Sequence, residues 1–145
     1  MSTLFLFGLM FAGGIAVAIQ PSINGRLAQK VGFIESSCIS FAVGTMALLI
    51  TAMIAGKGNF RGISQAHGWE LSGGLLGAFF VTMTIIIVPR IGTTSAMAAT
   101  IAAQLITGLI IDHYGLFGFR TVPVDFSRAF GVVLLLVGAG LVFRR

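Results

Sequence analysis

The sequence predicts an all-α integral membrane protein with five transmembrane helices in a single domain, residues 1–145. Composition is the first reason: 57% of the residues are hydrophobic and only 9% are charged, whereas about 25% are charged in an ordinary soluble domain. The second is that the charged residues lie between or at the edges of long apolar segments. A soluble domain of this length could not bury so much apolar surface.

Five segments approach the length of a membrane span, which is roughly 20 mostly apolar residues for about 30 Å of hydrocarbon. They cover approximately residues 4–24, 34–55, 69–88, 95–111 and 129–143, and the last two are short. Gly56-Lys57-Gly58-Asn59 ends the second segment, and Pro89-Arg90-Ile91-Gly92 stops the third and leaves a tight connection to the fourth. Residues 112–127 are predicted to form an interfacial loop. Small residues in the second and third segments favour close helix packing.

The basic residues divide almost evenly between the two sides that five spans would define. One side carries Arg26, Lys30, Arg90, Arg144 and Arg145, and the other carries Lys57, Arg61, Arg120 and Arg128. Because an excess of Lys and Arg sets orientation, this near tie predicts insertion either way round. Inverted copies could then form an antiparallel homodimer of ten helices, similar to the inverted repeats of transporters. Alternatively, loop length or the first helix fixes one orientation, and a homologous chain supplies the inverted half.

Polar residues inside the first and fourth segments are the candidate substrate-binding residues. Gln20 and Asn24 share a helix face beside Pro21, which is predicted to kink the helix. Thr100 and Gln104 share a face in the fourth segment. The alternative for Gln104 is an amide that bridges two helices, because an unpaired amide in hydrocarbon is costly. Amides and hydroxyls without a central charge fit a polar, neutral or zwitterionic solute.

Charged groups near the segment ends are candidates for gating or coupling. These are Glu35, Arg90, Asp112 and His113. The alternatives are structural: Glu35 suits a helix N-terminus, Asp112 and His113 suit a membrane-interface anchor, and Arg90 suits lipid phosphates or an ion pair. No Asp, Glu, Lys, Arg or His lies in the middle of a span, which disfavours a proton antiporter with a buried acid.

Several other classes of function lack the residues that they need. The basic residues form no cluster larger than Arg144-Arg145, which disfavours a nucleic-acid surface. The single cysteine, Cys38, belongs to no zinc or redox motif, and neither an activated nucleophile nor a metal-ligand cluster is visible. The sequence therefore predicts no enzyme activity, no cofactor and no metal. The expected partners are a small-molecule solute, the lipid bilayer and a second copy or homologous chain.

Four motifs in order carry a family resemblance that covers nearly the whole chain. They are Gln20 with Ile23-Asn24-Gly25-Arg26-Leu27; Pro89-Arg90-Ile91-Gly92; Gln104 with Ile110-Ile111-Asp112-His113-Tyr114-Gly115-Leu116-Phe117-Gly118; and Arg128 with Gly131. Together they resemble the YdcZ family of the drug/metabolite transporter superfamily. Ala103 departs from the family, where glycine is expected before Gln104. The resemblance implies a multi-pass protein of a bacterial-type inner membrane, equivalent to half of a ten-span transporter.

We therefore expect a secondary transporter or exporter of a small polar metabolite that works by alternating access as a dimer. One alternative is a dual-topology ion channel, since thirteen phenylalanines could line a pore. The other is a non-transporting membrane scaffold or accessory subunit.

Overall fold

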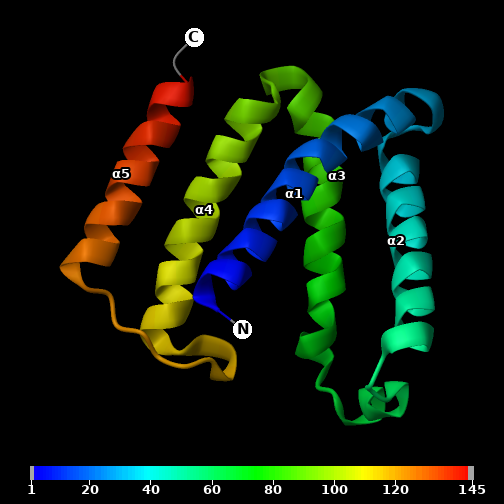
Figure 1. Ribbon diagram of the computed structural model, residues 1–145. Helices are drawn as coiled ribbons and strands as arrows, with labels where there is room; N and C mark the ends of the chain where they lie inside the picture. The colour runs from blue at the N-terminus through cyan, green and yellow to red at the C-terminus, as the bar shows by residue number, and fades with distance from the viewer. Residues whose placement is uncertain (1, 144–145) are drawn as a thin grey trace. The chain divides into compact units, whose positions relative to one another are not determined.

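The structure is a computed structural model that describes residues 2–143, so Arg144 and Arg145 of the charge balance lie outside the described residues. The described chain is helical, with no strand between residues 2 and 143 (Figure 1). Five helices are long and apolar enough to cross a membrane. Their bounds are α1 Thr3–Val31, α2 Phe33–Ala55, α3 Gly73–Ile91, α4 Thr93–Tyr114 and α5 Phe126–Phe143, and the short 3-10 helices are η1 Phe60–Gln65, η2 Gly68–Ser72 and η3 Leu116–Gly118.

Helix α1 extends seven residues beyond the predicted end of the first span, to Val31. The helix ends at Gly32, whose φ of 102° breaks it while its N–H donates to the carbonyl of Ala28 at 2.9 Å. Pro21 lies inside α1 and is buried. The helix therefore continues through the proline, and the kink stays a prediction.

The connections on either side of α3 differ in length. Between α2 and α3 the chain forms η1 and η2, where the Glu70 carboxylate accepts a hydrogen bond from the His67 N–H at 2.6 Å. Between α3 and α4 stands Gly92 alone, with φ of 84°, which confirms the tight connection. Helix α3 ends at Ile91, two residues after Pro89.

The described residues form two compact units, residues 2–90 and residues 91–143. In the first unit, α1 crosses α3 and α2 runs beside α3 (Figure 1). Its small core contains Ala28, Val81 and Ile85. A Cβ atom on Gly77 would lie 3.4 Å from the Cζ of Phe41, so the ring of Phe41 on α2 reaches α3 at this glycine. The close approach of the helix backbones stays a prediction.

In the second unit, α4 and α5 lie side by side and antiparallel (Figure 1). The loop between them folds back on α4: Val122 donates its N–H to the carbonyl of Asp112 at 2.8 Å. Gly115, with φ of 61°, follows α4, and a Cβ atom there would overlap the Thr121 hydroxyl. Ala96 is the one buried residue among the described positions of α4 and α5.

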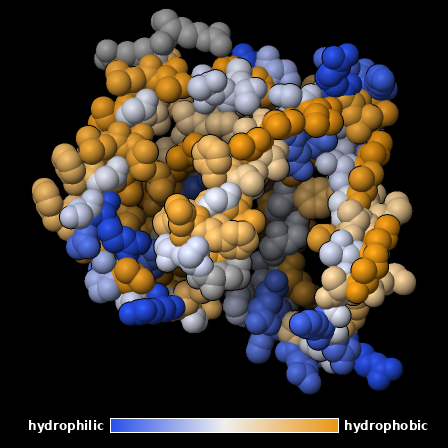
Figure 2. Space-filling model, in the orientation of Figure 1, coloured by the Kyte–Doolittle hydropathy of each residue, from blue (hydrophilic) through white to orange (hydrophobic). Residues whose placement is uncertain are grey.

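The surface of the described residues is largely apolar. Hydrophobic residues cover most of the face in Figure 2, and hydrophilic ones gather near helix ends. Large side chains such as Phe7, Met53 and Leu134 are more than half exposed. Because an aqueous protein rarely exposes a contiguous patch of this kind, this surface suits lipid and facing membrane helices.

Candidate functional site

Gln20 lies on a groove between α1 and α2, called here the α1–α2 groove, of about 180 Å³. The other residues that line it are Ser40, Phe41, Gly44, Thr45 and Leu48. Gln20 is exposed, and its amide makes no hydrogen bond to another described residue. Two hydroxyl groups and one amide therefore converge on a surface that is otherwise apolar.

Asn24 lies one turn further along α1 but is buried, with 6% of its surface exposed. Its Nδ2 donates to Ser40 Oγ at 3.1 Å, and its backbone carbonyl accepts from Ser36 Oγ at 2.8 Å. The amide thus joins α1 to α2 in the described structure. Ser40 connects this interhelical contact to the α1–α2 groove, which places Asn24 behind the groove wall.

Hydroxyl groups also join α2 to α3. Thr82 Oγ1 lies 2.9 Å from Ser37 Oγ and 2.8 Å from the carbonyl of Ala78. Ser37 Oγ in turn donates to the carbonyl of Phe33 at 3.0 Å. A hydroxyl is both donor and acceptor, so these short side chains can satisfy one another without a charged group.

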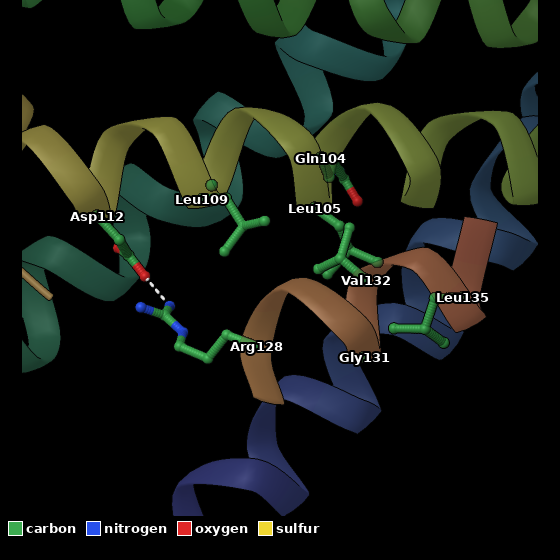
Figure 3. Close-up of a pocket in the computed structure, with 9 residues that line it drawn as sticks. Gln104, Leu105, Leu109, Asp112, Arg128, Gly131, Val132 and Leu135 are labelled. Carbon is green, nitrogen blue, oxygen red and sulfur yellow. Dashed lines mark hydrogen bonds and ion pairs between the residues drawn. The ribbon is translucent and has the colours of Figure 1, made fainter. Parts of the chain in front are cut away.

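Gln104 lies on a second groove, between α4 and α5, of about 360 Å³ (Figure 3). This α4–α5 groove is lined by Gln104, Leu105, Gly108, Leu109, Asp112, Arg128, Gly131, Val132 and Leu135. Figure 3 shows Asp112 and Arg128 joined toward one end and Gln104 toward the other. The Gln104 amide forms no hydrogen bond with another described residue, and it is exposed.

The ion pair between Asp112 and Arg128 ties the end of α4 to the start of α5. Arg128 Nη2 lies 2.5 Å from Asp112 Oδ2, and Arg128 Nη1 donates to the carbonyl of Val122 at 3.0 Å. The backbone N–H of Arg128 donates to Asp125 Oδ1 at 2.7 Å. About a third of each paired side chain is exposed, 33% for Arg128 and 39% for Asp112. One arginine therefore holds both ends of the loop at the mouth of the groove.

Thr100 and His113 make contacts within or next to α4 rather than in the groove. The Thr100 hydroxyl donates to the carbonyl of Ala96 at 3.0 Å. His113 Nδ1 accepts the N–H of Val124 at 3.3 Å, and its ring meets Tyr114 edge-on at 4.8 Å between centroids. Of Thr100 and Gln104, only Gln104 lines the α4–α5 groove.

Glu35 and Arg90 lie at helix ends in the first unit. Glu35 is in the first turn of α2, with its carboxylate against Gly32, where a Cβ atom would overlap it. Arg90 is exposed in the last turn of α3 and has no hydrogen bond or ion pair with any described residue. No cluster of three or more His, Cys, Asp or Glu among residues 2–143 could hold a metal ion.

Sequence reasoning missed Arg128 as a site residue, and it treated Ser36 and Ser40 only as packing residues or not at all. A signal for Arg128 was available. Asp112 ends one predicted span and Arg128 begins the next, so a hairpin brings the two charges to the same end. The serines gave no such signal, because a hydroxyl on an apolar helix can equally bond to its own backbone.

Comparisons with known proteins find relatives by sequence. No solved structure matches the chain. The sequence is 32% identical over 143 residues to the inner membrane protein YdcZ of Escherichia coli (strain K12), which covers 94% of this chain and 93% of that protein. The profile of the family described as "Putative inner membrane exporter, YdcZ" matches residues 5–141. The match and the five apolar helices identify a multi-pass inner membrane protein. The chain therefore belongs to the YdcZ family of inner membrane exporters.

Proposed function

We propose that this chain is half of an exporter for a small polar metabolite and works by alternating access as an antiparallel homodimer of ten helices. The observation that carries the proposal is the odd number of spans, five, combined with basic residues that divide five to four between the two sides. Such a chain can insert in both orientations. Two inverted copies then reproduce the inverted repeats of many transporters.

The polar groups on the two grooves support a solute path. Gln20 and Gln104 each present an amide that no described residue satisfies. An unsatisfied amide in hydrocarbon costs several kcal/mol, roughly 2–7 depending on the reference. A solute, water or a facing subunit is the partner that each amide requires. Thr100 and Asn24 remain proposed members of the path, reached when the helices rearrange.

Glu35, Arg90, Asp112 and His113 are the groups proposed to gate or couple transport. Asp112 is the most direct candidate, because its ion pair with Arg128 joins two helices at the mouth of a groove. Opening that pair would separate the helix ends and widen the groove. The absence of charge in the middle of the spans favours a uniporter or an exchanger over coupling through a buried acid.

Orientation tests the dimer model. A reporter fused after Arg145 should give signal from both sides of the membrane. Two or three lysines added to the loop between α2 and α3 should move the signal to one side, because they create an excess of positive charge. Signal from one side only in the unmodified chain would exclude an antiparallel homodimer and require a homologous partner of opposite orientation.

Flux tests the transport activity. Proteoliposomes are loaded with an isotope-labelled mixture of small bacterial metabolites, and efflux is followed by mass spectrometry. A carrier gives saturable efflux and counterflow, and a Gln20→Leu/Gln104→Leu double variant abolishes it. Current far above carrier turnover would instead identify a channel. If no metabolite in the mixture leaves faster than it leaves liposomes without protein, the transport proposal fails and the scaffold alternative remains.

A further inference from the structure

The α4–α5 groove has polar groups at both ends and apolar walls between them. From this arrangement we propose that it binds a small amphipathic zwitterion, with the solute's anion on Arg128, its ammonium group on Asp112 and its apolar body against the leucine and valine walls. This inference rests on the proposed transport function and names the chemical class of its solute.

The ion pair retains hydrogen-bonding capacity for such a ligand. A guanidinium group has five N–H donors; one on Nη2 bonds Asp112 and one on Nη1 bonds the carbonyl of Val122, which leaves three. Asp112 uses Oδ2 for Arg128, and Oδ1 has no hydrogen bond to a described residue. A zwitterion can therefore add to the pair without displacing either partner. It also adds no net charge, whereas a lone anion or cation would leave an unbalanced charge beside hydrocarbon.

Two glycines make room for the apolar body. Gly108 on α4 and Gly131 on α5 both line the groove, and a Cβ atom on either would meet no heavy atom within 4 Å. The walls beside them are Leu105, Leu109, Val132 and Leu135. Unbranched carbon chains fit a slot of this kind, and a large side chain at either glycine would occupy it.

The dimensions of the groove limit the size of the solute. Gln104 and Asp112 are eight residues apart on α4, which is about 12 Å along the helix axis. The volume of about 360 Å³ lies at the lower end of the roughly 300–1,000 Å³ that small-molecule sites occupy. That space suits a solute with a short carbon chain rather than the two acyl chains of a phospholipid. A polar group at the far end of the chain would satisfy the Gln104 amide.

Binding of radiolabelled norleucine (2-aminohexanoic acid) to the purified full-length protein in lipid nanodiscs tests the proposal by equilibrium dialysis. Norleucine should bind saturably. Hexanoate and hexylamine, which each lack one charge, should compete at least tenfold more weakly than unlabelled norleucine. The 6-hydroxy derivative of norleucine should compete at least as well as norleucine, because its hydroxyl can bond the Gln104 amide. Any advantage of the hydroxyl should disappear in Gln104→Leu. Absence of saturable binding by both zwitterions overturns the proposal, as does equal competition by the singly charged probes.

Variants locate the binding in the groove. Arg128→Gln and Asp112→Asn should each weaken norleucine binding at least tenfold. Gly131→Leu fills the groove while the ion pair remains, so it should abolish binding even if the charge variants fold poorly. The matched controls are Arg120→Gln, a cation of the same loop, and Gly140→Leu, on the opposite face of α5 from Gly131; both should bind as wild type. Loss of binding in these controls to the same extent contradicts the assignment.

Counterflow separates this proposal from the proposed function. Norleucine binding without counterflow in proteoliposomes would reject transport but retain the site. Counterflow of other metabolites with no zwitterion binding would retain transport and reject the zwitterion site.

Discussion

Four polar residues are buried among α1, α2 and α3, namely Asn24, Ser36, Ser37 and Thr84, whereas none is buried among the described residues of α4 and α5. The first unit joins its helices by hydroxyl and amide bonds within the spans. The second joins its two helices by an ion pair at their ends and leaves a groove of about 360 Å³ between them.

This difference shows two ways to associate helices in a bilayer. Lipid chains are as apolar as leucine, so association depends on close packing and interhelical hydrogen bonds rather than on the hydrophobic effect. The first unit uses both and forms a packed scaffold. Between the described residues of α4 and α5 the only hydrogen bond is that of the Asp112–Arg128 pair, so no polar contact inside the spans opposes their separation around a solute.

Truncating the core of the first unit should have the largest effect on stability. Ile85 is fully buried, so Ile85→Ala should lower the free energy of unfolding by about 2 kcal/mol, the lower end of the range for such changes. We expect a value at the lower end of that range because a side chain leaving the core would face lipid, so no hydrophobic transfer free energy is lost. SDS titration in micelles, followed by circular dichroism, measures it. Leu134→Ala, at an exposed position of α5, is the control and should change stability by less than about 0.5 kcal/mol. Equal losses of stability in Ile85→Ala and Leu134→Ala would mean that the first unit is no more tightly packed than the second.

Removing one interhelical hydrogen bond should have the next largest effect. Ser36→Ala removes the hydroxyl that donates to the carbonyl of Asn24 from the neighbouring helix and should cost about 0.6–1.7 kcal/mol, as for other membrane helices. The same SDS titration measures it. Thr51→Ala is the matched control, because that exposed hydroxyl bonds only the carbonyl of Ala47 in its own helix. A loss in Thr51→Ala as large as in Ser36→Ala would show that the interhelical position does not matter.

Breaking the ion pair should have a smaller and local effect. Asp112 and Arg128 are each about a third exposed, so Asp112→Asn should cost below about 1 kcal/mol globally after solvent screening. Hydrogen exchange should instead accelerate at residues 116–125, since the loop loses an anchor. Glu35→Gln, a neutralised carboxylate in the first unit, should leave that exchange unchanged. Unaltered exchange in Asp112→Asn would mean that the backbone bonds alone hold the loop.

Thr100→Ala should have the smallest effect. Its hydroxyl bonds the carbonyl of Ala96 in its own helix, a contact that adds little to helix stability, so the change should stay within about 0.5 kcal/mol. Metabolite efflux should fall less than in Gln104→Leu, because only Gln104 lines the α4–α5 groove. Equal losses of efflux would place Thr100 in the solute path and extend that path beyond the groove.

The helices were predictable from sequence because hydropathy and length suffice to find a span. All five expected segments contain a helix, and glycines with positive φ separate α1 from α2 and α3 from α4. The extension of α1 to Val31 was missed because polarity alone suggested a loop. Residues 26–30 include Arg26, Gln29 and Lys30 but are all good helix formers, and propensity continues a helix where hydropathy ends.

The contacts between helices were less predictable. A sequence pattern gives the face of each residue but not the helix that faces it, so Asn24 read as a solute contact although the structure bonds it to Ser40. The Asp112–Arg128 pair is the exception, since hairpin geometry alone brings its two ends together. The amides of Gln20 and Gln104, predicted as solute contacts, line the α1–α2 and α4–α5 grooves, and their part in solute binding stays a prediction.

The unequal lengths of α1 and α5 have a consequence for the membrane itself. At 1.5 Å per residue, the 29 residues of α1 span about 44 Å and the 18 residues of α5 about 27 Å, against about 30 Å of hydrocarbon. In one bilayer α1 must tilt or protrude, while α5 can barely cross. The apolar part of α1, residues 4–24, is about 32 Å long and matches the hydrocarbon, so thickening the bilayer adds mismatch chiefly at α5. Lipids with longer acyl chains should therefore disturb the second unit before the first and lower efflux.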